Sequence, residues 1–373
     1  METEIILSKY DTFKKEVNDN YPIRKNLTFA DINIDFEDDN YKYGTITIEG
    51  KSLPLTNSAF KSLLSTLGVN DTFIKKFTSI FGVKSKNQLV GVIKNKMATS
   101  NDKTVSMYIH PQTLKIVAIT PVNKPYVSPD FYFNMVENVM SDNNLDVTNM
   151  NMDSTGNLSI STLNTGWGFD VDGLKDEAFN TGVIMTAGPT EDIAVDPHIL
   201  RLICSNGMVG PRRLEMGPRL ESSSIDDISK FMGELNGIQE HNKQFKSVFK
   251  DQVKKMNNIN ASYHEMVQLR DMVESKVTDI NDSRTEAVLE KYFPTRGVRK
   301  EYNEKGVYLS NLTKRHHKNT KTDMTTWELL NSLTDVASHD YGMGIGELAK
   351  ADLKKQSGLY MFKKEFDTEF LVS

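Results

Sequence analysis

The chain has 373 residues, with 38% hydrophobic residues, 25% charged residues and a formal net charge of −5, which is typical of a folded protein of two or three domains. No apolar run approaches the roughly 20 residues that cross a bilayer, and Met1–Glu4 lacks the basic start of a secretory signal. The single cysteine, Cys204, excludes an internal disulfide and a cysteine-rich zinc site. We therefore expect a cytoplasmic protein with no membrane partner.

Residues 1–100 are expected to form one unit of short strands followed by helices. Alternating polar and apolar residues predict a β-rich entry, with strands at 33–36 and 43–48. Apolar residues three and four apart then predict three helices, at about 56–67, 71–81 and 85–97. The phenylalanine and leucine residues of these helices are expected to form a core and not a ligand site.

Residues 101–221 are expected to form an antiparallel, β-rich core with at least one helix. A period of two predicts hairpins at 104–120 and 145–161, and Pro129 stands at the first turn of an amphipathic helix between them. Strand-like runs follow at 182–186 and 193–195.

The apolar run 199–203 is predicted to be a buried strand. It is expected to stop in a turn at Asn206-Gly207, because both residues tolerate a positive φ. Cys204 is expected to be a small buried hydrophobe and not a nucleophile. The segment would thus deliver a turn, and then Arg212-Arg213, to the protein surface.

Residues 222–373 are expected to be mainly helical. Apolar residues at helical spacing predict helices at 225–238 and over 245–280, although asparagines crowd the middle of the second and favour equally a kinked or two-part helix. Pro294 should stop the next helix, and a last helix begins near Thr325. The chain is therefore predicted to be an α+β protein, with an antiparallel sheet and packed helices followed by a mainly helical C-terminal region.

Charge is distributed unevenly along the chain. The segment 284–321 holds ten Lys or Arg against four Asp or Glu, so it carries +6 in a chain of net charge −5. One basic segment in an acidic protein indicates a localised anion-binding site. The alternative is a solvated helical face with a basic loop, whose cations pair with acids elsewhere in the chain.

We find no residue pattern that predicts a catalytic or cofactor site. The glycine-rich run 342–346 follows a helix instead of a strand and lacks the Gly-Lys-Ser/Thr of a phosphate loop, so it is expected to be a flexible connector. His316 and His317, with His339 further on, lack the spacing of two metal ligands on one helix face. We therefore predict no catalytic residue, no metal ligand and no cofactor, and expect the adjacent histidines to add to a basic patch.

Nucleic-acid binding is the chemistry that the cations favour. A compact cationic run, 314–318, lies between Tyr308 and Trp327, and cations that contact phosphates beside rings that stack on bases make a single-strand platform. Arg212-Arg213 would add a second cationic point at the rim of the sheet. The predicted interface comprises the cationic residues Arg212, Arg213, Arg296, Arg299, Lys314, Arg315, His316, Lys318 and Lys321, with Tyr308 and Trp327 as stacking residues.

Three segments, in this order, resemble a family of phage and plasmid proteins called domain of unknown function 932: Leu55–Leu64, Arg201–Val209, and Trp327–Thr334 with His339. The central segment is the most specific of the three. Ser332 stands where the family often has Ala, and no His closely follows Arg212-Arg213, where members often carry Arg-His. The resemblance implies an accessory protein of a mobile element, placed in the host cytoplasm if phage-encoded. A sheet followed by a basic helical part also resembles, in outline, the ring-forming single-strand annealing proteins of phages.

We expect a non-enzymatic DNA-binding protein that favours single-stranded DNA, forms a homo-oligomer and acts in recombination, replication or genome protection. The alternative is a virion structural protein or an antagonist of host defence, which binds a host protein and no nucleic acid. In that case the 245–280 helix would be the assembly surface. A metal-dependent nuclease that uses His316, His317 or His339 is the third hypothesis.

Overall fold

The computed structural model describes most of the chain, in the ranges 2–35, 43–69, 85–172, 178–201, 206–209, 217–277, 283–294, 321–339 and 341–345, together with residues 174, 349, 350, 353, 356, 357, 360 and 361. Within these residues the fold is α+β, as predicted, with antiparallel sheets and packed helices. None of the helices described there is both long enough and apolar enough to span a bilayer.

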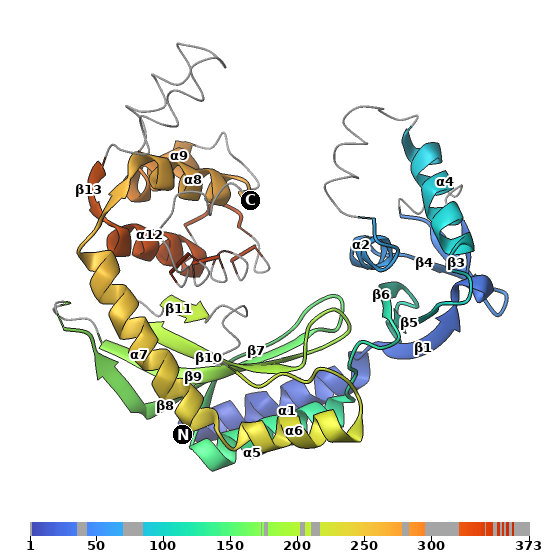
Figure 1. Cartoon of the computed structure of the whole chain (residues 1–373), viewed down its shortest axis with the longest axis horizontal. Coiled ribbons are helices and arrows are strands. Elements are labelled where there is room, and N and C mark those ends of the chain that lie inside the picture. Colours follow the sequence, from blue (N-terminus) through green and yellow to red (C-terminus); the bar gives the residue numbers. More distant parts are fainter. Residues whose placement is uncertain are drawn as a thin grey trace, which may run out of the picture.

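A five-stranded antiparallel sheet forms the centre of the molecule (Figure 1). Its strands lie in the order β11-β10-β9-β8-β7, so each strand pairs with its neighbour in the sequence. The strands are β7 (Asp146–Met152), β8 (Leu158–Asp170), β9 (Ala178–Ala187), β10 (Ala194–Arg201) and β11 (Asn206–Val209). The hairpin predicted at 145–161 and the strands predicted at 182–186 and 193–195 are confirmed.

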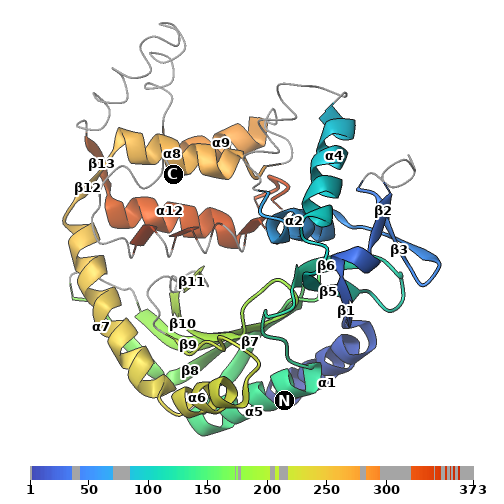
Figure 2. The ribbon, with the colours of Figure 1, turned by 45° about the vertical axis from the view of Figure 1, so that its right-hand side comes forward.

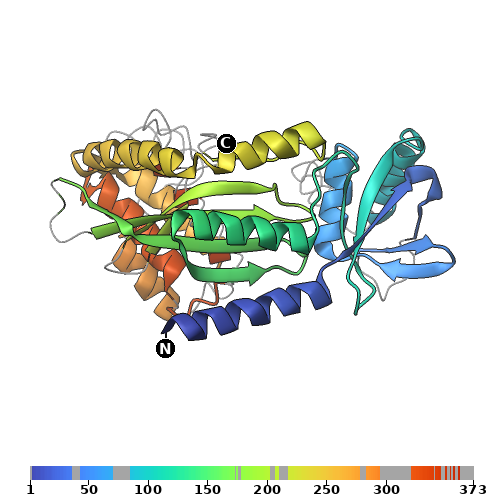
Figure 3. The same ribbon diagram turned by 90° about the horizontal axis from the view of Figure 1, so that it is seen from below.

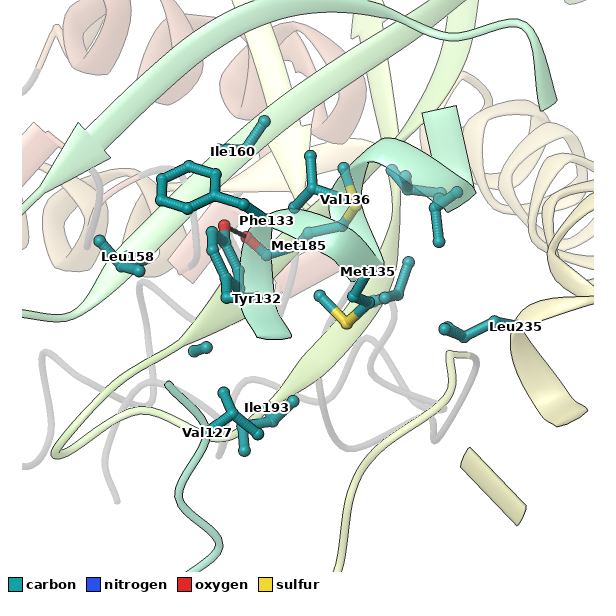
Figure 4. Close-up of a cluster of buried hydrophobic side chains, with 14 of the residues drawn as sticks. Val127, Tyr132, Phe133, Met135, Val136, Leu158, Ile160, Met185, Ile193 and Leu235 are labelled. Carbon is teal, nitrogen blue, oxygen red and sulfur yellow. Dashed lines mark hydrogen bonds between the residues drawn. The ribbon is translucent and has the colours of Figure 1, made fainter. Parts of the chain in front are cut away.

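One face of this sheet packs against three helices, α1 (Glu2–Asn20), α5 (Pro129–Asn143) and α6 (Ile225–Leu235). Helix α5 begins as predicted, with Pro129 in its first turn and with the Ser128 side chain accepting a hydrogen bond from the backbone N–H of Phe131. Its Tyr132 is buried among apolar side chains of α5 and the sheet (Figure 4), and the hydroxyl donates to the carbonyl of Met185 over 2.9 Å. The hydrogen bond satisfies a phenol that would otherwise be costly to bury.

Helix α1 departs from the sequence prediction. The β-rich entry expected for the first fifty residues is wrong for residues 2–20, which form this helix. From Ser8 onwards only Tyr10, Phe13 and Val17 join the core, and polar or charged residues fill the other positions. So narrow an apolar stripe is a weak helical pattern, and packing against α5 and β7 stabilises the helix.

The described residues between Ile23 and Pro121 form a separate lobe that is inserted between α1 and α5 (Figures 1 and 3). One three-stranded sheet has the order β1-β5-β6 and the other the order β2-β3-β4. The elements are β1 (Ile23–Thr28), a short 3-10 helix (Phe29–Asp31), β2 (Asn33–Asp35), β3 (Thr45–Ile48), β4 (Lys51–Pro54), α2 (Asn57–Thr66), α4 (Ser85–Ala98), β5 (Thr104–Ile109) and β6 (Ile116–Pro121). These confirm the helices predicted at about 56–67 and 85–97 and the hairpin at 104–120, whereas the helix predicted at 71–81 lies outside the described residues.

The inserted lobe has a core of its own. Leu63 of α2, Ile93 of α4 and Met107 of β5 belong to one buried cluster, separate from the cluster beneath the central sheet. The structure therefore groups β5 and β6 with β1, α2 and α4, not with the five-stranded sheet. At the junction of the lobe, the Arg24 guanidinium lies 5.0 Å from the ring of Tyr126, and Arg24 Nη2 donates to the carbonyl of Val122 over 3.1 Å.

The turn predicted at Asn206-Gly207 is wrong. Both residues lie in β11, where Asn206 pairs with Arg201 and Gly207 with Leu200. Tolerance of a positive φ is only a local preference for a turn. The backbone hydrogen bonds that the free edge of β10 offers stabilise a strand more than this preference favours a turn. Of the buried strand predicted at 199–203, residues 199–201 lie in β10 and Ile199 is 1% exposed, whereas Leu202, Ile203 and Cys204 lie outside the described residues.

The C-terminal region is mainly helical, as predicted. Its elements are α7 (Ile238–Asn257), β12 (Asn260–Ser262), α8 (Tyr263–Glu274), α9 (Ser283–Tyr292), β13 (Lys321–Thr325) and α12 (Thr326–Ser338). The segment 245–280 is thus the two-part alternative, broken after Asn257, and the helix before Pro294 ends at Tyr292. Figure 2 shows α8 and α9 beyond α12, which itself packs against β11 and α7.

Candidate nucleic-acid interface

Helix α7 packs across the end of the central sheet and divides into an apolar face and a basic face. Phe245, Phe249, Val253 and Met256 recur at spacings of three and four and are buried against β8, β9 and α12. A second set of residues at the same spacing is basic. We call it the lysine stripe, and it consists of Lys243, Lys246, Lys250 and Lys254.

The centre of the lysine stripe lies against the ring of Phe169, near the end of β8. Lys246 Nζ is 4.8 Å and Lys250 Nζ 5.3 Å from the centroid of this ring. Phe169 in turn stacks on Phe179 of β9, with ring centroids 5.5 Å apart, and meets Phe249 edge to face. The contacts with Phe179 and Phe249 therefore fix the position of the Phe169 ring. Cation–π attraction holds the ammonium groups of Lys246 and Lys250 against this ring.

The two ends of the lysine stripe are ion-paired with neighbouring acids. Lys243 Nζ is 3.4 Å from Glu240 one turn earlier, and Lys254 Nζ is 2.8 Å from Asp172, which follows β8. The hydrogen bond between Lys254 and Asp172 raises the pKa of the lysine and lowers the pKa of the carboxyl. These are exposed pairs, and such pairs contribute little to stability and exchange partners readily.

The two central lysines differ from the ends of the stripe in their charged neighbours. Among the described residues, no carboxylate lies within ion-pair distance of Lys246 or Lys250. Burial lowers the pKa of Lys246, and the ammonium of Lys250 lowers it further. An anion bound between Lys246 and Lys250 would offset the repulsion between their ammonium groups. The centre of the stripe therefore favours an anion.

The length of the lysine stripe suits a chain of phosphates. Lys243 and Lys254 are eleven residues apart, which is about 17 Å along a helix that rises 1.5 Å per residue. Lys254 and Lys255 in the last turn also complement the negative end of the helix dipole. A row of cations over this distance can contact several successive phosphates of a nucleic-acid strand.

The central sheet itself offers little to a polyanion. Its five strands contain a single Lys or Arg, Arg201, in the last position of β10. The buried carboxylate of Asp196 on β10 accepts a hydrogen bond from Arg219, which neutralises that charge. Among the described residues, the row of cations beside the sheet is therefore the one on α7.

Most of the interface residues predicted from the sequence lie outside the described residues: Arg212, Arg213, Arg296, Arg299, Tyr308, Lys314, Arg315, His316 and Lys318. Lys321 is described and is exposed at the start of β13. It pairs with Ser262 of β12, the short strand that follows α7. The end of the basic segment is thus held close to the C-terminal end of the lysine stripe (Figure 1).

The stacking role predicted for Trp327 is wrong. Its side chain is 2% exposed, with ring centroids 6.2 Å from both Phe179 and Phe249. The indole belongs to the core that joins α7, α12 and the sheet, because it stands on the apolar face of α12. A ring enclosed in this way has no face on which a base can stack.

The lysine stripe carried a signal that the sequence prediction missed. The helix prediction for 245–280 depends on apolar residues alone, yet the lysines at 243, 246, 250 and 254 recur at the same helical period. Their spacing places them on one face of any helix that spans them. The contact with Phe169 had no such signal, because it joins residues about eighty positions apart.

The C-terminal end of α12 shows a second polar arrangement. His339 Nδ1 lies 3.1 Å from a carboxylate oxygen of Asp335, and the hydroxyl of Tyr341 donates to the other oxygen over 2.6 Å. Such a carboxylate orients an imidazole, which is a common feature of catalytic and metal sites. However, across the described ranges no group of three His, Cys, Asp or Glu side chains is placed to hold a metal ion. The contacts link the end of α12 to the residues that follow it.

Comparison of the chain with protein-family models, with curated proteins and with solved structures found no match.

Proposed function

We propose that this protein is a non-enzymatic DNA-binding protein and that the lysine stripe of α7 contacts the phosphate backbone. The observation that carries the proposal is the pair Lys246 and Lys250, two cations held beside one aromatic ring without a carboxylate partner among the described residues. The resemblance to phage and plasmid proteins supports two further parts of the proposal. These are a role in recombination, replication or genome protection, and assembly as a homo-oligomer.

Phosphate is the anion that this arrangement fits best. A carboxylate ligand would need one or two cations, whereas the stripe holds four along the helix. The lysines at its two ends pair with the exposed acids Glu240 and Asp172. Exchange of these carboxylates for the phosphates of a polyanion would cost little free energy. Lys321, which pairs with Ser262 just after α7, adds a further cation beyond the helix.

Charge removal at the centre of the stripe tests the proposal. In the double variant Lys246→Ala/Lys250→Ala, two phosphate contacts are lost, and we expect the affinity for a labelled oligonucleotide at low salt to fall about tenfold. Fluorescence anisotropy measures this directly.

The matched control is Lys94→Ala/Lys96→Ala. These two lysines are exposed on α4 in the inserted lobe, so the control removes the same charge far from α7. Equal losses of affinity in both variants would mean that net charge and not the lysine stripe governs binding. Absence of binding by the unaltered protein, even at low salt, would refute the proposed function.

A further inference from the structure

Strand β8 contains a large bulge beside the lysine stripe. Asn164 pairs with Thr181 and Phe169 with Phe179, so four residues of β8 stand opposite one residue of β9. The bulge is anchored by the buried side chain of Asn164. Its Oδ1 accepts from the N–H of Gly166 over 2.7 Å, and its Nδ2 donates to the carbonyl of Asn143 over 2.8 Å. Bulges of this kind are typically used to redirect a side chain.

The side chain that this bulge redirects is Trp167. It is partly exposed, and it packs against the core beneath the sheet. Glycines flank it on both sides, and a Cβ on Gly166 would make a tight contact of 3.1 Å with Asn164 Oδ1. The neighbours on either side of this large aromatic ring along the strand thus carry no side chain.

The bulge and the lysine stripe are in direct contact. Gly168, the residue after Trp167, accepts a hydrogen bond from Lys246 Nζ over 3.4 Å. The next residue is Phe169, whose ring lies under Lys246 and Lys250. Trp167 is therefore two residues before Phe169, the residue whose ring Lys246 and Lys250 contact.

We infer that the lysine stripe binds single-stranded nucleic acid and that the indole of Trp167 stacks on one of its bases. This inference rests on the proposed function, since the lysines would hold the phosphates of the same strand. An aromatic ring beside a row of cations recognises a single strand, because each unpaired base offers a face to the ring. In a duplex the bases are already stacked on one another, so Trp167 would gain nothing from it.

Intrinsic fluorescence tests the inference, because the chain has two tryptophans and the other, Trp327, is buried. In the variant Trp327→Phe, the emission comes from Trp167 alone. Titration with an oligothymidylate of about 20 nucleotides, longer than a usual binding site, should quench this emission, and a duplex of equal length should not. For a protein labelled with 5-fluorotryptophan and otherwise unaltered, the ¹⁹F resonance of Trp167 should shift while that of Trp327 stays in place.

Substitution of Trp167 supplies the second measurement. Trp167→Ala should weaken binding of the oligothymidylate about tenfold and leave duplex binding unchanged, whereas Trp167→Phe should retain most of the affinity. Circular dichroism establishes that each variant is folded. If Trp167→Ala binds both probes as the unaltered protein does, and neither quenching nor a ¹⁹F shift occurs, stacking by Trp167 is refuted while the lysine stripe stands. If neither probe binds the unaltered protein, the proposed function fails with it.

Discussion

The guanidinium of Arg270 is the most strongly held charge among the described residues. The side chain is 0% exposed and contacts Glu274, Glu286 and Glu290 at 2.7–2.8 Å, which ties α8 to α9. It also donates to the carbonyl of Phe293. Burial lowers the pKa of Arg270, but the three carboxylate hydrogen bonds outweigh this effect and raise it. Four hydrogen bonds thus hold the guanidinium between α8 and α9.

Removal of the Arg270 side chain should lower the stability of the helical region. In Arg270→Ala the three carboxylates lose their shared partner, and we expect the free energy of unfolding to fall by about 3–5 kcal/mol. Urea denaturation followed by circular dichroism measures the change. Lys14→Ala, which breaks the exposed pair with Glu137, is the control and should cost at most about 1 kcal/mol. Similar costs for the two variants would show that Arg270 is not a structural tie.

The two tryptophans show what sequence reasoning can assign to single residues. The sequence predicts Trp327 at the interface because it follows a cationic run, whereas Trp167 lies in a stretch for which the sequence predicts no element and no role. The structure buries the first and leaves the second partly exposed. Nearness along the chain does not decide exposure, which depends on whether a partner element covers the side chain. The bulge that presents Trp167 arises from the pairing of β8 with β9, so it is visible only in three dimensions.

At the scale of elements, most of the boundaries follow from local signals. The starts of α2, α5 and α12 are each marked by a Ser or Thr side chain that accepts from the backbone N–H of the helix. The break after Asn257 also follows from the asparagines there. The errors lie where tertiary contacts outweigh local preference, as in α1 and in the turn expected at Asn206-Gly207.

The core that joins α7, α12 and the sheet yields a prediction about Trp327. In the described structure its indole N–H has no hydrogen-bond partner, so Trp327→Phe removes an unsatisfied donor together with some buried area. The two effects oppose each other, and we expect the free energy of unfolding to change by no more than about 1 kcal/mol. DNA affinity should be unchanged, as measured by anisotropy. A tenfold loss of affinity in a variant that unfolds normally would restore a direct role for this residue.

At the scale of the whole molecule, the inserted lobe and the rest of the protein have separate cores. The chain passes between them at Pro22 and again at Val122, and Arg24 bonds to the second crossing at the carbonyl of Val122. Both ends of the lobe thus lie together, as in domains inserted into other domains. The lysine stripe lies at the end of the central sheet away from this lobe (Figures 1 and 3).

Separate cores predict separate unfolding. Leu63 is fully buried in the lobe, and Leu63→Ala should destabilise the lobe by about 2–5 kcal/mol without changing DNA affinity. Hydrogen exchange should then accelerate in β3, β5 and β6 and stay slow in β8 and β9. Faster exchange throughout the molecule would mean that the two cores unfold as one unit.

The salt dependence of binding tests the central claim most directly. Each phosphate of a single strand that a lysine neutralises adds about −0.7 to the slope of log K against log salt concentration. Loss of Lys246 and Lys250 should therefore make the slope shallower by about 1.4, while the control Lys94→Ala/Lys96→Ala keeps the slope of the unaltered protein. An identical slope for the unaltered protein and for Lys246→Ala/Lys250→Ala would contradict phosphate contact by the lysine stripe.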